Sequence, residues 1–145
     1  MIALLQRVSH GSVFVDGVAV GQIGHGTVLF LGIEKGDTEA QACKLAERVV
    51  GYRLFADDDG KMNNSLQDTS GGLLIVPQFT LVADTGQGLR PGFEPAAAPA
   101  DAEPLFDAFV EAAKAAHGQV AVGTFGADMQ VNLTNDGPVT FILNG

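Results

Sequence analysis

Short apolar runs divided by glycine-containing turns are the feature that most limits what this chain can fold into. The runs with the length and composition of strands are residues 1–8, 12–15, 18–23, 27–33, 53–55, 73–79, 119–123, 128–134 and 139–143. Asp16-Gly17 is a strong hairpin signal between two of them, because both residues tolerate a positive φ. Residues 62–66 are predicted to be extended as well. The runs follow one another mostly in hairpin order, which predicts a largely antiparallel sheet system.

Two helices are predicted between these runs. Thr38 and Gln41 have the spacing of a capping box at the start of the first helix. Apolar residues then recur at helical spacing as far as Gly51. The second helix follows residues 96–99, and Pro104 is predicted to lie in its first turn. We therefore predict a single α+β domain over residues 1–145, with a curled or barrel-like, largely antiparallel sheet and two packed helices.

Net charge is the strongest limit on possible partners. The chain carries 8 Lys and Arg against 17 Asp and Glu, a net charge of −9, so its surface should repel DNA and the body of an RNA. A single exposed RNA end needs few phosphate contacts and stays possible. No apolar run approaches the roughly 20 residues that span a bilayer, so no membrane partner is expected. Cys43 is the only cysteine, which excludes an internal disulfide and fits a cytoplasmic location.

Conventional catalytic sets are scarce in this sequence. His10, His25, His117 and Cys43 are scattered along the chain, without the spacing of a zinc site, so neither a metal nor another cofactor is expected. No Gly-x-Ser-x-Gly elbow is present. Thr80 is a candidate nucleophile, although a hydroxyl without a neighbouring base is weak. The scarcity favours a mechanism that relies on backbone groups.

Two short stretches carry a family resemblance. Pro77-Gln78-Phe79-Thr80-Leu81 follows an apolar strand, and Asn135-Asp136-Gly137-Pro138-Val139-Thr140 joins the last two predicted strands. Together they resemble the two signature motifs of the D-aminoacyl-tRNA deacylase family, of the bacterial and eukaryotic type. Further similarity runs through residues 1–8, 47–53, 60–63 and 127–131. The resemblance implies a homodimer that hydrolyses the ester at the aminoacylated 3′ end of tRNA, at a site on the subunit interface.

The resemblance also implies roles for single residues. The backbone at Gln78, Phe79 and Thr80 would hold the ester and supply N–H donors for the oxyanion, while a ribose hydroxyl assists the reaction. Gly137-Pro138, as a cis pair, would reach into the partner's pocket and reject L-residues by clash, so that glycyl esters also pass. These roles make the two motifs parts of one composite site.

Arg7 would brace the Gly137-Pro138 element, and Met129 would form pocket wall. Spacing alone favours an ordinary turn with a trans proline at Gly137-Pro138, because only roughly 5–6% of X-Pro bonds in folded proteins are cis. It is equally compatible with Arg7 as an exposed strand residue, and Met129 is otherwise core packing. The sequence leaves these alternatives open.

One residue departs from the family pattern. Pro77 stands where the motif usually has serine, so any role for a hydroxyl at that position is in doubt. A mechanism that uses backbone N–H groups of residues 78–80 is not affected. Two other functions stay open at this stage: a generic esterase with Thr80 as nucleophile, and a non-catalytic dimeric module that binds an amino acid or a nucleotide.

Overall fold

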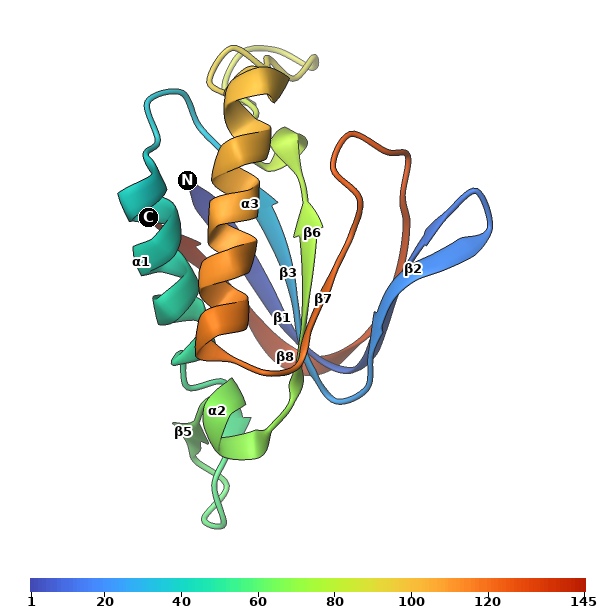
Figure 1. The fold of residues 1–145 in the computed structure, drawn as a ribbon, viewed down its shortest axis with the longest axis vertical. Coiled ribbons are helices and arrows are strands. Elements are labelled where there is room, and N and C mark those ends of the chain that lie inside the picture. Colours follow the sequence, from blue (N-terminus) through green and yellow to red (C-terminus); the bar gives the residue numbers. More distant parts are fainter.

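The computed structural model describes all 145 residues and contains a large curled β-sheet with two long helices on one face (Figure 1). The strands are β1 (Ile2–Val15), β2 (Val18–Ile23), β3 (Gly26–Gly32), β4 (Phe55–Ala56), β5 (Met62–Asn64), β6 (Gly72–Pro77), β7 (Val120–Val122) and β8 (Gln130–Asn144). The helices are α1 (Glu39–Val50), α2 (Leu66–Thr69), α3 (Pro99–Ala116) and a 3₁₀ turn, η1 (Phe79–Val82). The large sheet has the order β2-β1-β3-β6-β7, and β8 also pairs with β1. Strands β4 and β5 form a separate two-stranded sheet.

Strand β1 is the centre of this arrangement. Its first half pairs with β3 and its second half with β2, while β8 follows its other edge over nearly the whole length. The prediction of two strands over residues 1–15 is therefore wrong. His10 and Gly11 stay in the strand because Thr134 and Leu133 of β8 pair with them. Pairing with a distant strand outweighs the local preference of glycine.

The sheet is mixed, with its parallel part on one side. Strands β1, β2, β3 and β8 pair antiparallel, whereas β3, β6 and β7 run parallel. The two parallel steps are crossovers that contain α1 and α3, as parallel pairing requires. The predicted α+β class with a largely antiparallel, barrel-like sheet is confirmed.

The helix predictions hold with two corrections. Thr38 and Gln41 form both bonds of the predicted capping box, and α1 is the helix that follows. Pro104 lies inside α3 and not in its first turn, because the helix already begins at Pro99. The extended segment ends at Asn64, and Ser65 caps the short helix α2. The Ser65 N–H donates to the Asp68 carboxylate and lowers the pKa of that group.

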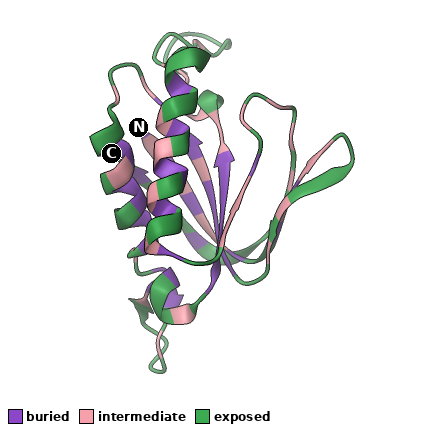
Figure 2. Ribbon diagram, in the orientation of Figure 1, coloured by how far each residue is buried: buried purple, intermediate pink, exposed green.

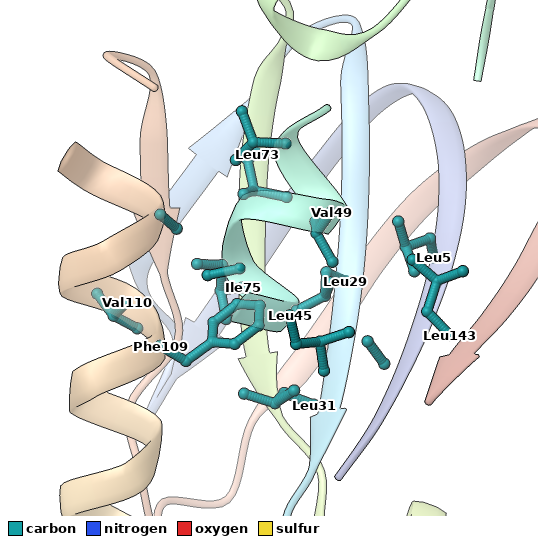
Figure 3. Packing of buried hydrophobic residues seen from close by; sticks show 14 of the residues in the cluster. Leu5, Leu29, Leu31, Leu45, Val49, Leu73, Ile75, Phe109, Val110 and Leu143 are labelled. Atoms are coloured by element: carbon teal, nitrogen blue, oxygen red, sulfur yellow. The ribbon is translucent and has the colours of Figure 1, made fainter. Parts of the chain in front are cut away.

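The main hydrophobic core lies between the sheet and the two long helices (Figure 3). Leu29, Leu31, Leu73 and Ile75 face the helices from the centre of the sheet, and Phe109 meets them from α3. Burial is therefore concentrated in β3, β6 and the inward helix surfaces, while the outward surfaces are exposed (Figure 2). No helix of the structure is both long and apolar enough to cross a membrane.

A second, smaller core fills the concave side of the sheet. It consists of Val8, Val13, Val28, Leu74 and Val76. The sheet curls around these side chains until β2 approaches β7. A Cβ atom at Gly21 would lie 3.0 Å from the carbonyl oxygen of Val122, so a larger residue would push β2 and β7 apart by a few tenths of an ångström. The curled sheet is open at the end where β3 and β6 finish, and the pocket lies at this open end.

Candidate active site

A cavity of about 640 Å³ opens where β3 and β6 end. Its walls come from the ends of these strands, the start of η1, the segment that leads into α3, and the segment between β7 and β8. The lining residues are Leu31, Ile33, Val76, Pro77, Gln78, Phe79, Phe93, Ala96, Ala97, Ala98, Pro99, Ala102, Phe106, Phe125, Gly126, Ala127, Asp128, Met129 and Val131. Asp128 is the only ionisable side chain among them. The pocket is thus an apolar enclosure with very few polar groups, as is typical of small-ligand sites.

The chain turns sharply at the floor of this pocket. Pro77 ends β6, and the Gln78 N–H donates a last bond of 2.8 Å to the carbonyl oxygen of Leu31. Residues 79–82 then form η1. The predicted strand over residues 73–79 is therefore too long by two residues at this end. Since the Gln78 N–H is occupied, it is not free to bind a ligand, contrary to the expectation for residues 78–80.

The next two N–H groups are free. Those of Phe79 and Thr80 form no hydrogen bond within the protein, because they precede the first i→i+3 bond of η1. Phe79 is 60% exposed, and its ring packs against Phe93 with centroids 5.2 Å apart. The Gln78 side chain donates from Nε2 to the Thr80 hydroxyl. Two adjacent free donors therefore lie at the edge of an apolar pocket.

No base accompanies the Thr80 hydroxyl. The imidazole of His117 is buried at the end of α3, where Nε2 lies 2.6 Å from the Gly71 carbonyl oxygen. His10 contacts Thr134, and the ring of His25 packs against Phe55. All three histidines thus have their contacts elsewhere. No three His, Cys, Asp or Glu side chains converge on a set that could hold a metal ion.

The second motif lies in the middle of β8. Gln6 pairs with Thr140 and Val8 pairs with Asn135, so residues 136–139 stand opposite the single residue Arg7. The structure therefore has one irregular strand where two strands joined by a turn were predicted. We call residues 136–139 the β8 bulge. The Gly137–Pro138 peptide bond within it is cis.

Arg7 holds one flank of the β8 bulge. Its Nε lies 2.9 Å from Oδ2 of Asp136 and 3.3 Å from the Asp136 carbonyl oxygen. Its Nη1 donates to the carbonyl oxygen of Leu54 at 2.9 Å. Arg7 is therefore not a free surface arginine, since its side chain is only 15% exposed and ties the bulge to the segment after α1.

The pocket and the β8 bulge lie at opposite ends of the sheet. Arg7 is level with Thr27 and Leu73, whereas the pocket begins level with Leu31 and Pro77. Four residues along a strand correspond to about 13 Å. In Figure 1 the end of β6 lies at the upper end of the sheet, while the middle of β8 passes behind its lower end.

Within one chain, the predicted site residues thus form two groups. Gln78, Phe79 and Met129 line the pocket, with Thr80 next to them in η1. Arg7, Gly137 and Pro138 lie in and beside the bulge. The structure does not bring the two groups together in a single chain.

Several pocket residues were not predicted. Phe93 and residues 96–99 come from the long segment after η1, and Phe125 and Asp128 from the segment between β7 and β8. Paired backbone bonds between Asp84 and Gly92 close the first segment into a loop and direct Phe93 toward Phe79. For the segment that carries Phe93, the signal in the sequence was its length. For Asp128, the signal was the family similarity of residues 127–131.

Comparisons with known proteins agree with this architecture. The D-aminoacyl-tRNA deacylase of Methylococcus capsulatus is 57% identical over 143 residues, which cover 99% of this chain and 94% of that protein. The protein of the same name from Thioalkalivibrio sulfidiphilus is 59% identical, with 99% and 96% coverage. The solved structure of a c-Myc DNA unwinding element binding protein superposes with a TM-score of 0.94 at 35% identity, covering 100% of this chain and 99% of that one.

A probable eukaryotic D-amino acid tRNA deacylase shares the fold, with a TM-score of 0.85 at 18% identity and coverage of 98% and 97%. The sequence also matches the family described as D-Tyr-tRNA(Tyr) deacylase over residues 4–144. The protein is thus an enzyme of the hydrolase class. It belongs to the D-Tyr-tRNA(Tyr) deacylase family, and the membership predicted from the two motifs is confirmed.

Proposed function

We propose that this protein hydrolyses the ester bond between a D-amino acid and the 3′ end of tRNA. The observation that carries the mechanism is the pair of free N–H groups at Phe79 and Thr80, at the edge of an apolar pocket. Preorganised donors that face a developing oxyanion are worth most where water is excluded. An aminoacyl ester is already activated and carries a ribose hydroxyl beside the scissile bond, so a positioned water suffices as nucleophile.

Selection for the D-form depends on a second copy of the chain. We propose that the β8 bulge of one subunit enters the pocket of its partner. Backbone carbonyls of Gly137 and Pro138 then accept from the α-amino group and leave no room for an L side chain. The separation of the bulge from the pocket within one chain supports this exchange. Glycyl esters have no side chain to reject and are hydrolysed as well.

The direct test is hydrolysis of matched D-tyrosyl-tRNA and L-tyrosyl-tRNA, with glycyl-tRNA as a third substrate. We expect rapid release from the D ester and the glycyl ester, and protection of the L ester. Equal rates for the D and L esters, or no release from the D ester, refute the proposal. Absence of any turnover would leave a binding module as the better interpretation.

The role of the backbone donors is tested with two substitutions at one position. Phe79→Pro removes the free N–H at the start of η1, where proline fits and no protein hydrogen bond is lost. Phe79→Ala removes the ring but keeps the N–H. Loss of an oxyanion donor costs about 10²–10³ in kcat. We expect a deficit of that size for Phe79→Pro relative to Phe79→Ala, and equal kcat values would exclude the Phe79 N–H as a donor.

The exchange between subunits is tested by complementation. Gly137→Val should fold, because the added Cβ meets only Oδ1 of Asn135, at 3.4 Å. Its side chain would block the partner's pocket. Random mixing with Phe79→Pro gives about half heterodimers, each with one intact site of two, hence about a quarter of wild-type activity. If each subunit instead used its own bulge, the mixture would stay inactive.

A further inference from the structure

The side chain of Asn135 connects the two ends of the β8 bulge. Its Nδ2 donates to the carbonyl oxygen of Arg7 in β1 at 2.9 Å and to that of Val139 at 3.2 Å. Val139 lies at the other end of the bulge, so one carboxamide joins both of its ends to β1. Its Oδ1 lies 3.4 Å from the place that a Cβ atom on Gly137 would occupy. The carboxamide therefore lies beside Gly137, between the two ends of the bulge, although Asn135 as a whole is exposed.

Asn135 and Arg7 hold different parts of the bulge. The Arg7 guanidinium fixes Asp136, through its carboxylate and its carbonyl oxygen. Asn135 fixes the two strand ends from which the bulge projects. An asparagine side chain has two N–H donors on one nitrogen, which matches two carbonyl acceptors. Aspartate cannot donate here, and its charge would repel both carbonyl oxygens.

We propose that Asn135 is a positioning residue, whose carboxamide sets how far and in which direction Gly137–Pro138 projects, and thereby sets the D-to-L selectivity of the partner's site. This inference rests on the proposed function, since it assumes that the bulge acts as the filter. Rejection by clash requires a rigid surface, because a functional group must be held to about 0.5 Å of its productive position. A bulge whose two ends are not held together can move aside for an L side chain.

Asn135→Ala and Asn135→Asp test this role, and Asn132→Asp is the control. Asn132 lies in the same strand, is exposed, and its side chain makes no hydrogen bond in the protein. It therefore reports the effect of adding one negative charge to β8. The measured quantities are kcat and KM for D- and L-tyrosyl-tRNA, with the melting temperature of each variant.

We expect both Asn135 variants to lower the D-to-L ratio of kcat/KM by about tenfold, through faster hydrolysis of the L ester. Tenfold corresponds to about 1.4 kcal/mol, close to the net value of one or two hydrogen bonds. Asn132→Asp should keep the wild-type ratio. A purely structural role would lower kcat/KM for both esters by one factor, and this result would overturn the proposal.

A folded Asn135 variant with an unchanged ratio would also overturn it. Should Asn135→Ala fail to fold, Asn135→Ser keeps one hydroxyl donor, and its ratio should lie between those of the wild type and Asn135→Asp. Failure of the proposed function would look different, because the wild type itself would then show no preference for the D ester.

Discussion

Replacing Thr80 by alanine separates a backbone mechanism from a nucleophilic one. The Thr80 hydroxyl has one partner in the structure, the Nε2 donor of Gln78. No histidine or carboxylate contacts it, so nothing in the protein accepts its proton. A nucleophilic hydroxyl needs an adjacent base within about 2.6–3.2 Å. We therefore expect Thr80→Ala to keep the reaction running.

The two mechanisms predict rate losses of very different size. Thr80→Ala deletes one exposed side-chain hydrogen bond, which is worth about 1 kcal/mol or less, since water replaces it. A change of that size lowers the rate by about fivefold at most. Loss of a true nucleophile lowers kcat by about 10⁴-fold or more. The two expectations differ by at least about three powers of ten.

The assay is single-turnover release of D-tyrosine from D-tyrosyl-tRNA with enzyme in excess, so that product release does not limit the rate. Thr80→Ser keeps the hydroxyl and serves as the matched control. A loss above about 10³-fold in Thr80→Ala, together with an active Thr80→Ser, would show that the hydroxyl takes part in the chemistry. The assignment of the reaction to backbone donors and the ribose hydroxyl would then be wrong.

Three further predictions concern stability. Phe109 is completely buried between α3 and the sheet, so Phe109→Ala should lower the free energy of unfolding by about 3–5 kcal/mol in urea titrations; a loss below about 1 kcal/mol would contradict this packing. Burial lowers the pKa of the Met1 amino group. Hydrogen bonds to Asp37 and Glu34 and the charges of these carboxylates together raise it by more than burial lowers it, so the net direction is upward from 8.0. Its stabilisation is therefore present below about pH 8 and lost as pH rises through the folded-state pKa, and Asp37→Asn should flatten this fall in melting temperature. Pro77→Ser should lower the free energy of unfolding by about 0.4–1 kcal/mol, because serine leaves the unfolded chain freer, and should change kcat by less than about threefold.

Local chemistry made part of the fold predictable. Asp16 and Gly17 have φ of 49° and 78°, as the hairpin signal requires, and the bonds of Thr38 and Gln41 lie within four residues of each other. These features need no partner from elsewhere in the chain. The two motifs were found for the same reason, since each is a short continuous stretch.

Long-range pairing made other parts unpredictable. Residues 9–11 look like a break, but His10 and Gly11 pair with Thr134 and Leu133 of β8, more than a hundred positions away, and Gly11 also pairs with Ile23 of β2. The pocket is also assembled from distant segments. Phe79 contacts Phe93 because two backbone hydrogen bonds between Asp84 and Gly92 close the loop between them. Such contacts leave no periodic signal, because each side contributes only one or two residues.

The acidic surface and the apolar pocket are compatible with action on tRNA only if one end of the molecule enters. No basic side chain lines the pocket, so it cannot neutralise a phosphate. The net charge of −9 repels the rest of the polyanion. A typical RNA binder loses affinity as salt rises, because it releases counterions from the phosphates that it contacts. Here salt also screens the repulsion between enzyme and substrate, which acts in the opposite direction. Under the proposed function, affinity comes from burial of apolar surface and from hydrogen bonds to the backbone, and the pocket and η1 offer an apolar lining and two free N–H groups.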